Sequence, residues 1–250
     1  MPLVLQLLGT VQVSWADRPL KFATEHSRAL LAYLAVEADK THPRAILATL
    51  LWPEEQEAAA RQNLRQALVF LKQGLQSLPE RDQILQVTTT TVQWNSQGVT
   101  VDLDQLQQLY RLCQMHSHTN VQACPYCIER MTEAVTLYRG EFLSGLTLKQ
   151  SQPFEEWSLF LREQTHRQIA EMLETLASHH LAQANYDQTQ LFATRLVTLE
   201  PWHEEAHRQL MRALAAKGQQ SAALRQYEAC RRTLQEELGV LPSPETVNLY

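Results

Sequence analysis

Hydrophobic and polar residues alternate at the start of the chain. In "LVLQLLG" and "TVQVSW" the apolar side chains fall mostly on alternate positions, and a turn at "ADRP" separates them from the short apolar stretch "LKF". A period of two is typical of strands with one buried face. The pattern therefore predicts a small antiparallel sheet at the beginning of the chain.

The pattern then changes to a helical period. Thr24 is the expected N-cap of "EHSRALLAYLAVE", Pro43 is expected at the first helical position of "PRAILATLLW", and Trp52-Pro53 should end that helix. A third helix is predicted within "LLWPEEQEAAARQNLRQALVFLKQGL", and two β-rich runs in "ILQVTTTTVQWN" predict a hairpin. Strands, three helices and a terminal hairpin describe a winged helix, whose third helix enters the DNA major groove.

The predicted third helix has two different faces. Its buried side should be a leucine stripe: Leu64, Leu68, Leu71, Leu75 and Leu78. The cations and amides beside that stripe are groups that bind phosphates and base edges. We expect bases or phosphates to be read by Arg61, Gln62, Arg65 and Gln66, with DNA backbone contacts from Lys72, Arg44, Thr89 and Thr90. The alternative is an ordinary amphipathic helix with a solvated polar face, and threonines that serve only as strand formers.

From Asp102 onward the pattern is helical. Two segments, "ASHHLAQANYDQTQLFATRLVTLEP" and "LMRALAAKGQQSAALRQYEACRRTL", align with an offset of 33 residues, which indicates tetratricopeptide-like helical pairs. Gly140 is expected to end a helix, and "LPSP" after Gly239 to stop another helix before a last short element. Stacked pairs of this kind form a surface that binds a peptide or a protein, although such a layer can also serve only as a support or a dimer contact.

These patterns predict a mainly α fold with a small β component. Residues 1–98 should form a winged helix-turn-helix domain that binds DNA, and residues 99–250 an all-α, tetratricopeptide-like interaction domain.

The stretch "CQMHSHTNVQACPYC" contains candidate metal ligands. Cys113 and His116 are three residues apart near a predicted helix end, Cys124 and Cys127 form a CxxC pair, and His118 is a spare candidate. Four such side chains suit a tetrahedral structural zinc site. The alternative is reduced cysteines that pack as small hydrophobic residues beside exposed histidines.

Several motifs resemble those of a known family. "EHSRALLAYLAV", "LLWPEE", "ARQNLRQALVFLKQGL" and "VQWN" resemble the OmpR-like winged helix of the Streptomyces antibiotic regulatory protein (SARP) family. "LYRGEFLSGL", "FEEWSLFLRE", "LEPWHEEAHRQLMRAL" and "LRQYEACRRTLQEELGVLPSPET" resemble its bacterial transcriptional activator domain. The resemblance implies an activator that binds direct repeats in promoter DNA as side-by-side protomers, a candidate homodimer, and contacts the RNA polymerase holoenzyme.

Composition and missing motifs limit the other functions. The chain has 44% hydrophobic residues, a net charge of -5, and equal numbers of basic and acidic residues, nine each, in positions 1–100. We expect a cytoplasmic location and no membrane association, because no apolar run approaches the roughly 20 residues of a membrane span. We expect no enzyme and no required cofactor, because no phosphate loop, GxSxG or HExxH occurs. The rival hypothesis is an interaction module at the front of a larger signalling ATPase, with weak or no DNA binding.

Overall fold

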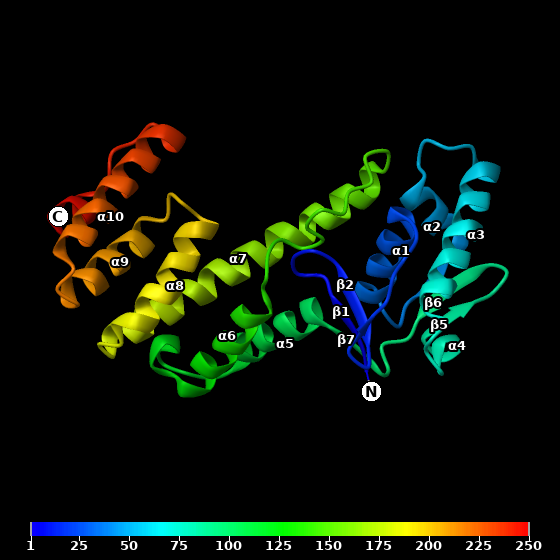
Figure 1. The fold of residues 1–250 in the computed structure, drawn as a ribbon, viewed down its shortest axis with the longest axis horizontal. Helices are drawn as coiled ribbons and strands as arrows, with labels where there is room; N and C mark the ends of the chain where they lie inside the picture. The colour runs from blue at the N-terminus through cyan, green and yellow to red at the C-terminus, as the bar shows by residue number, and fades with distance from the viewer. Residues whose placement is uncertain (1, 250) are drawn as a thin grey trace. The chain divides into compact units, whose positions relative to one another are not determined.

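The computed structural model describes residues 2–249, which divide into two compact units (Figure 1). The first unit comprises residues up to 108 together with 137–165, and the second comprises 109–136 together with residues from 166 on. This interleaving differs from a single boundary after residue 98. The reason is that two helices, α5 (Asp102–Met115) and α7 (Gln152–Ala182), each contribute residues to both units.

The first unit begins with a four-stranded sheet in the order β3-β2-β1-β7. Its strands are β1 (Leu3–Gln6), β2 (Gln12–Trp15), β3 (Arg18–Pro19) and β7 (Val99–Val101). The antiparallel pairing of β1 with β2 was predicted, but the third strand ends before "LKF". The parallel pairing of β1 with β7, in which Leu3 lies opposite Val99, was not predicted.

Three helices follow the pattern of the sequence closely. They are α1 (Glu25–Val36), α2 (Arg44–Leu51) and α3 (Glu57–Gly74). Thr24 caps α1 as expected, because its hydroxyl accepts a hydrogen bond from the Ser27 amide at 3.1 Å. The prediction for Pro43 was wrong by one position. This residue ends a strand and precedes α2, because its extended backbone still belongs to the pairing with the hairpin.

A second sheet, in the order β4-β6-β5, carries the predicted hairpin beside α3 (Figure 1). Its strands are β4 (Thr41–Pro43), β5 (Leu85–Val87) and β6 (Thr91–Trp94), and the short helix α4 (Arg81–Ile84) precedes β5. The Trp94 side chain at the end of β6 is fully buried. The hairpin is therefore attached both to β4 and to the core.

Residues 137–165 complete the first unit. Isolated bridges join Leu8 to Phe142 and Thr10 to Ser144. Gly140 was expected to end a helix, but α6 ends at Leu137, and Gly140 instead lies against Gly9, where an added Cβ would come within 3.4 Å of the Gly9 Cα.

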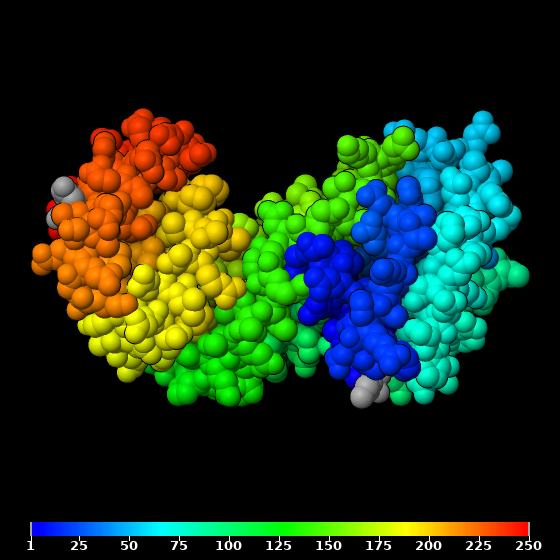
Figure 2. Space-filling model, in the orientation of Figure 1, coloured from blue at the N-terminus to red at the C-terminus, as the bar shows by residue number. Residues whose placement is uncertain are grey.

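The second unit consists of helices. After α5 and a short 3-10 helix at Val121–Ala123 come α6 (Pro125–Leu137), the second half of α7, α8 (Tyr186–Leu199), α9 (Glu204–Ala216), α10 (Gln220–Thr233), a π-helical turn at Leu234–Leu238, and α11 (Pro244–Leu249). Helices α8, α9 and α10 pack in chain order, and their surfaces appear from yellow to red in Figure 2. Gly239 ends its helix with a φ of 69°, shortly before the predicted stop at "LPSP", and the short helix α11 follows.

The helical pairs repeat with a period of 34 residues, not the 33 of the sequence alignment. Helices end at Ala182 and Ala216, and the next ones begin at Tyr186 and Gln220. A period of 34 is that of tetratricopeptide repeats. The mainly α fold with a small N-terminal β component is therefore confirmed, and among residues 2–249 no helix combines the length and apolarity needed to cross a membrane.

Candidate nucleic-acid interface

The buried leucine stripe sets the rotation of α3. Leu64, Leu68 and Leu71 are at most 4% exposed, and Leu75 and Leu78, which follow the helix, are equally buried. Because this stripe packs inward, the polar residues beside it must face outward. Arg61, Arg65 and Lys72 are all exposed, as the sequence predicted.

Arg44 reaches the same region from α2. The strand pairing places Pro43 opposite Thr91, so Arg44 follows directly beside the hairpin loop. Its backbone amide donates to the Thr90 carbonyl oxygen at 2.9 Å, and its Nη1 donates to the Thr88 carbonyl oxygen at 3.2 Å. These two bonds fix the start of α2 to the loop of the hairpin.

The hairpin loop is a compact threonine turn. The Thr88 hydroxyl accepts hydrogen bonds from the amides of Thr90 at 3.2 Å and Thr91 at 2.9 Å. Thr89 and Thr90 are exposed. The turn therefore presents two threonine side chains to solvent on a loop that its own hydrogen bonds hold in shape.

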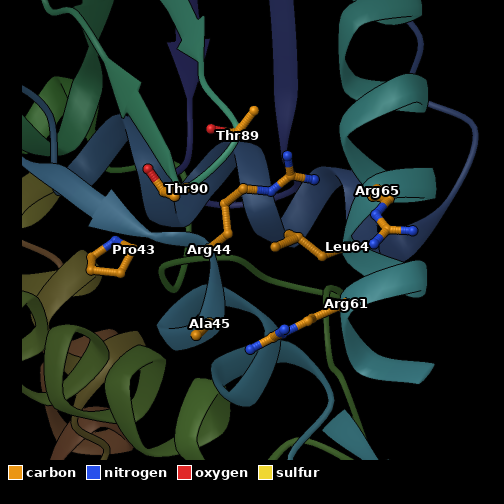
Figure 3. A pocket seen from close by; sticks show the side chains of 8 residues that line it. All are labelled: Pro43, Arg44, Ala45, Arg61, Leu64, Arg65, Thr89 and Thr90. Carbon is orange, nitrogen blue, oxygen red and sulfur yellow. The ribbon is translucent and has the colours of Figure 1, made fainter. Parts of the chain in front are cut away.

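These elements enclose a surface hollow of about 390 Å³ between α2, α3 and the hairpin loop. Figure 3 shows Thr89 and Thr90 on the loop above Arg44, with Arg61 and Arg65 extending from α3. The residues that line the hollow are Pro43, Arg44, Ala45, Arg61, Leu64, Arg65, Thr89 and Thr90. Three guanidinium groups and two hydroxyls with no carboxylate in the lining suit an anionic ligand that presents oxygen acceptors, such as a phosphate.

The structure thus brings five of the eight predicted DNA contacts together. Gln62, Gln66 and Lys72 also lie exposed on α3, but they are not among the described residues that line the hollow. Gln62 supports its neighbour, because its side-chain oxygen accepts a hydrogen bond from Arg65 Nη1 at 2.9 Å.

One partner was missed from the sequence. Glu57, in the first turn of α3, forms an ion pair with Arg61. The four-residue spacing within one helix could have indicated it. Both side chains are more than half exposed, and such exposed pairs contribute little stability, so a phosphate could compete with Glu57 for Arg61.

Three of the four predicted metal ligands lie together, and the spare candidate His118 joins them. The ligand atoms of His116, His118, Cys124 and Cys127 lie within 4.8 Å of one another, while Cys113 borders the group beside Cys127. The Cys113 thiol is buried and lies 3.7 Å from the carbonyl oxygen of Cys127. The Cys113 thiol is therefore a neighbour of the cluster at the start of α6.

A family model described as "Bacterial transcriptional activator domain" matches residues 101–250. The chain belongs to this family. The match begins close to the predicted domain boundary and covers the helical half of this family member. It also confirms the resemblance to SARP-type activators that the sequence motifs indicated.

Relatives of this bacterial transcriptional activator domain protein also match the first half of its chain. The transcriptional regulatory protein MoaR1 of Mycobacterium tuberculosis is 25% identical over 98% of this chain and 76% of its own length. The regulatory protein AfsR of Streptomyces coelicolor is 28% identical over 95% of this chain, which spans only 23% of AfsR. These relatives are regulators by name, and neither name denotes an enzyme.

A solved structure shares the fold. Mycobacterium tuberculosis EmbR, solved in complex with a low-affinity phosphopeptide, aligns with a TM-score of 0.68 and 21% identity. The alignment covers 99% of this chain and 64% of the EmbR chain. At this identity the likeness shows the fold, a winged helix followed by a helical domain.

Proposed function

We propose that this bacterial transcriptional activator domain protein is a sequence-specific DNA-binding regulator, with α3 in the major groove and the β5–β6 hairpin on the neighbouring backbone. The observation that carries the proposal is the hollow that gathers Arg44, Arg61 and Arg65 with two threonine hydroxyls. Among residues 2–249, no carboxylate lies within ion-pair distance of Arg44, Arg65 or Lys72. These cations are thus available to phosphates and base edges.

Arg65 is the best single residue on which to test the proposal. It is exposed at the middle of the α3 surface, and Gln62 already orients its guanidinium. A preorganised guanidinium that meets a base or a phosphate loses little side-chain entropy on binding. Loss of a base contact typically costs on the order of 1–3 kcal/mol of binding free energy.

The experiment is selection of genomic fragments by the full chain, followed by titration of the enriched fragment at several salt concentrations. The proposal expects enrichment of promoter direct repeats, an affinity that falls as salt rises, and roughly ten-fold weaker binding by Arg65→Ala. Arg18→Ala is the matched control, because it removes the same charge from the exposed strand β3 in the other sheet. Absence of enrichment at low salt, or equal effects of the two variants, would refute DNA reading by α3.

For the helical domain we propose contact with RNA polymerase. Apolar side chains remain about half exposed on it, among them Leu191 on α8, Trp202 before α9 and Leu224 on α10. Large side chains, tryptophan above all, often anchor protein interfaces, so these three residues are the proposed contact points. Leu191→Ser and Leu224→Ser should reduce transcription in a reconstituted reaction and leave DNA affinity unchanged. The DNA titration also gives the stoichiometry, and two chains per direct repeat are expected for side-by-side protomers.

The second candidate function is an interaction module of a larger signalling protein, with weak or no DNA binding. The ion pair between Glu57 and Arg61 supports it, because it lowers the positive charge on the α3 surface. The same fragment selection separates the two candidates, since an interaction module would enrich no DNA.

A further inference from the structure

Four side chains converge where α5 ends and α6 begins. The Nδ1 atom of His116 lies 3.5 Å from the Sγ atoms of both Cys124 and Cys127, and the Nδ1 atom of His118 lies 3.8 Å from the Cys127 Sγ. All four ligand atoms lie within 4.8 Å of one another. His116 follows the last residue of α5, Cys124 directly precedes α6, and Cys127 lies in the first turn of α6.

The three sulfur–nitrogen separations of 3.5–3.8 Å are close to those of a tetrahedral zinc site. Zinc binds sulfur at about 2.3 Å and nitrogen at about 2.0–2.1 Å, and a tetrahedral angle then places a sulfur and a nitrogen about 3.6 Å apart. Hydrogen bonds alone explain the arrangement less well, because a neutral Nδ1 offers one proton or one lone pair and His116 faces two sulfurs. We propose that His116, His118, Cys124 and Cys127 bind a structural zinc ion.

The donor set fits zinc in charge as well as in geometry. Two thiolates neutralise the two positive charges of zinc, so the complex of two cysteines and two neutral histidines buries no net charge. Four protein ligands leave no open coordination position, which is the mark of a structural and not a catalytic site. This inference is independent of DNA binding.

Neighbouring residues support the ligands. The Tyr126 ring stacks on the His116 imidazole with ring centroids 4.4 Å apart, and the Arg130 guanidinium lies 3.3 Å from the centre of the Tyr126 ring. Packing of this kind fixes the orientation of a metal-binding ring. Cys113 is not part of the proposed ligand set: its thiol lies 3.7 Å from the Cys127 carbonyl oxygen and borders the Cys127 side chain.

The zinc ion would hold the loop between α5 and α6 in place. Within that loop Asn120 caps the short helix Val121–Ala123, where its side-chain oxygen accepts from the Gln122 amide at 2.9 Å. The carbonyl oxygen of Gln122 in turn lies 2.6 Å from Nδ1 of His179 on α7. A metal that binds both ends of the loop would therefore stabilise its contact with α7 within the second unit.

The test is the zinc content of the full chain, purified without chelators and measured by mass spectrometry. We expect about one zinc ion per chain, lost in Cys124→Ser, Cys127→Ser and His118→Ala and retained in Cys113→Ser. X-ray absorption should show two sulfur and two nitrogen ligands at the distances typical of zinc. Cys113→Ser and His118→Ala form the decisive pair, because each removes one of the two competing fourth ligands.

Cobalt binding keeps the proposal testable if a variant fails to fold. The wild-type protein, stripped of metal and titrated with Co²⁺, should develop the visible absorption of tetrahedral cobalt and a thiolate charge-transfer band, and added zinc should abolish both. The proposal is overturned by a purified protein with less than about a tenth of a zinc ion per chain and no cobalt spectrum. Loss of zinc in Cys113→Ser with retention in His118→Ala would overturn the assigned ligand set.

Discussion

The side-chain amide of Gln226 on α10 contacts Nδ1 of His207 on α9 at 2.7 Å. The other ring nitrogen, Nε2, lies 2.9 Å from the carbonyl oxygen of Pro201. An amide nitrogen donates and a carbonyl oxygen accepts, so both contacts are satisfied only by a neutral imidazole with its proton on Nε2. Only 1% of His207 is exposed. The hydrogen bond between Gln226 and His207 therefore joins α9 to α10 only while the imidazole is neutral.

Acid should weaken the helical layer through His207. Burial lowers the pKa of His207 below its ordinary value of 6.5, so the unfolded chain binds the proton more readily than the folded chain. The contribution of neutral His207 to the free energy of unfolding is fully present above pH 6.5, and it is lost as the pH falls through the lowered pKa. Urea unfolding of the wild type and His207→Gln between about pH 8 and pH 5 should show a greater loss in the wild type.

A second histidine, His203, titrates in the same pH range. His203 lowers and Glu204 raises the pKa of His207, and Glu174 raises the pKa of His203 itself. The contribution of His203 has the opposite sign: it is complete below pH 6.5 and is lost as the pH rises through the raised pKa. Both proteins contain His203, so its contribution cancels when the unfolding free energies of the wild type and His207→Gln are compared at each pH. Parallel pH profiles of the two proteins would contradict the prediction.

Glu57→Gln should tighten DNA binding. The substitution releases Arg61 from its ion pair and removes one negative charge from the proposed DNA surface. We expect an affinity gain of about two- to ten-fold at low salt that shrinks as salt rises. Glu54→Gln is the matched control, since Glu54 is exposed and precedes α3. Equal gains in the two variants would assign the effect to net charge and not to Arg61.

Asp102→Asn should strongly destabilise the first unit. The Asp102 carboxylate accepts hydrogen bonds from the amides of Leu7 at 2.7 Å and Leu8 at 3.0 Å, and from Arg139 at 3.3 Å. Burial raises the pKa of Asp102 while these donors lower it, so the carboxylate depends on them to stay ionised. An asparagine would direct an N–H group at one of these donors, at a cost of about 2–4 kcal/mol of unfolding free energy.

Urea denaturation measures that cost. Asp17→Asn is the control, because Asp17 is exposed and has a φ of 59°, a backbone conformation that asparagine also adopts readily. The control should change the unfolding free energy by less than about 0.5 kcal/mol. A loss in Asp102→Asn no larger than in the control would contradict the role given to the carboxylate.

Gly74→Ala should destabilise the protein although alanine favours helices. A Cβ at Gly74, the last residue of α3, would overlap the ring of Phe22. Relief of such an overlap typically costs about 1–3 kcal/mol, more than the roughly 1 kcal/mol gained in helix propensity. Thermal unfolding of a double-mutant cycle with Phe22→Ala is the measurement. The cost of Gly74→Ala should largely disappear without the Phe22 ring, and an undiminished cost would refute the packing explanation.

Local signals account for the parts of the fold that the sequence could predict. Thr24 with Ser27, the leucine stripe of α3 and the β-rich runs of the hairpin all act within a few residues of one another. Their geometry follows from helical and strand periods alone. The same is true of the predicted DNA contacts on α3, whose exposure follows from the buried leucines.

Features that depend on distant partners could not be predicted. Strand β7 has three residues, too few to show a period, and it exists because β1 offers it a parallel edge. The position of His118 beside His116, Cys124 and Cys127 depends on the path of the loop after α5, which spacing does not determine. In each case the missing information is tertiary.

Several contacts that close the first unit join residues that are synthesised far apart in time. The amides of Leu7 and Leu8 leave the ribosome 95 and 94 residues before the Asp102 carboxylate that binds them. Trp157, whose indole contacts Glu37, follows its partner by 120 residues. The nascent helix α3 is therefore complete long before the unit that supports it can close. A shortened chain that is to keep this unit must retain the residues as far as 165.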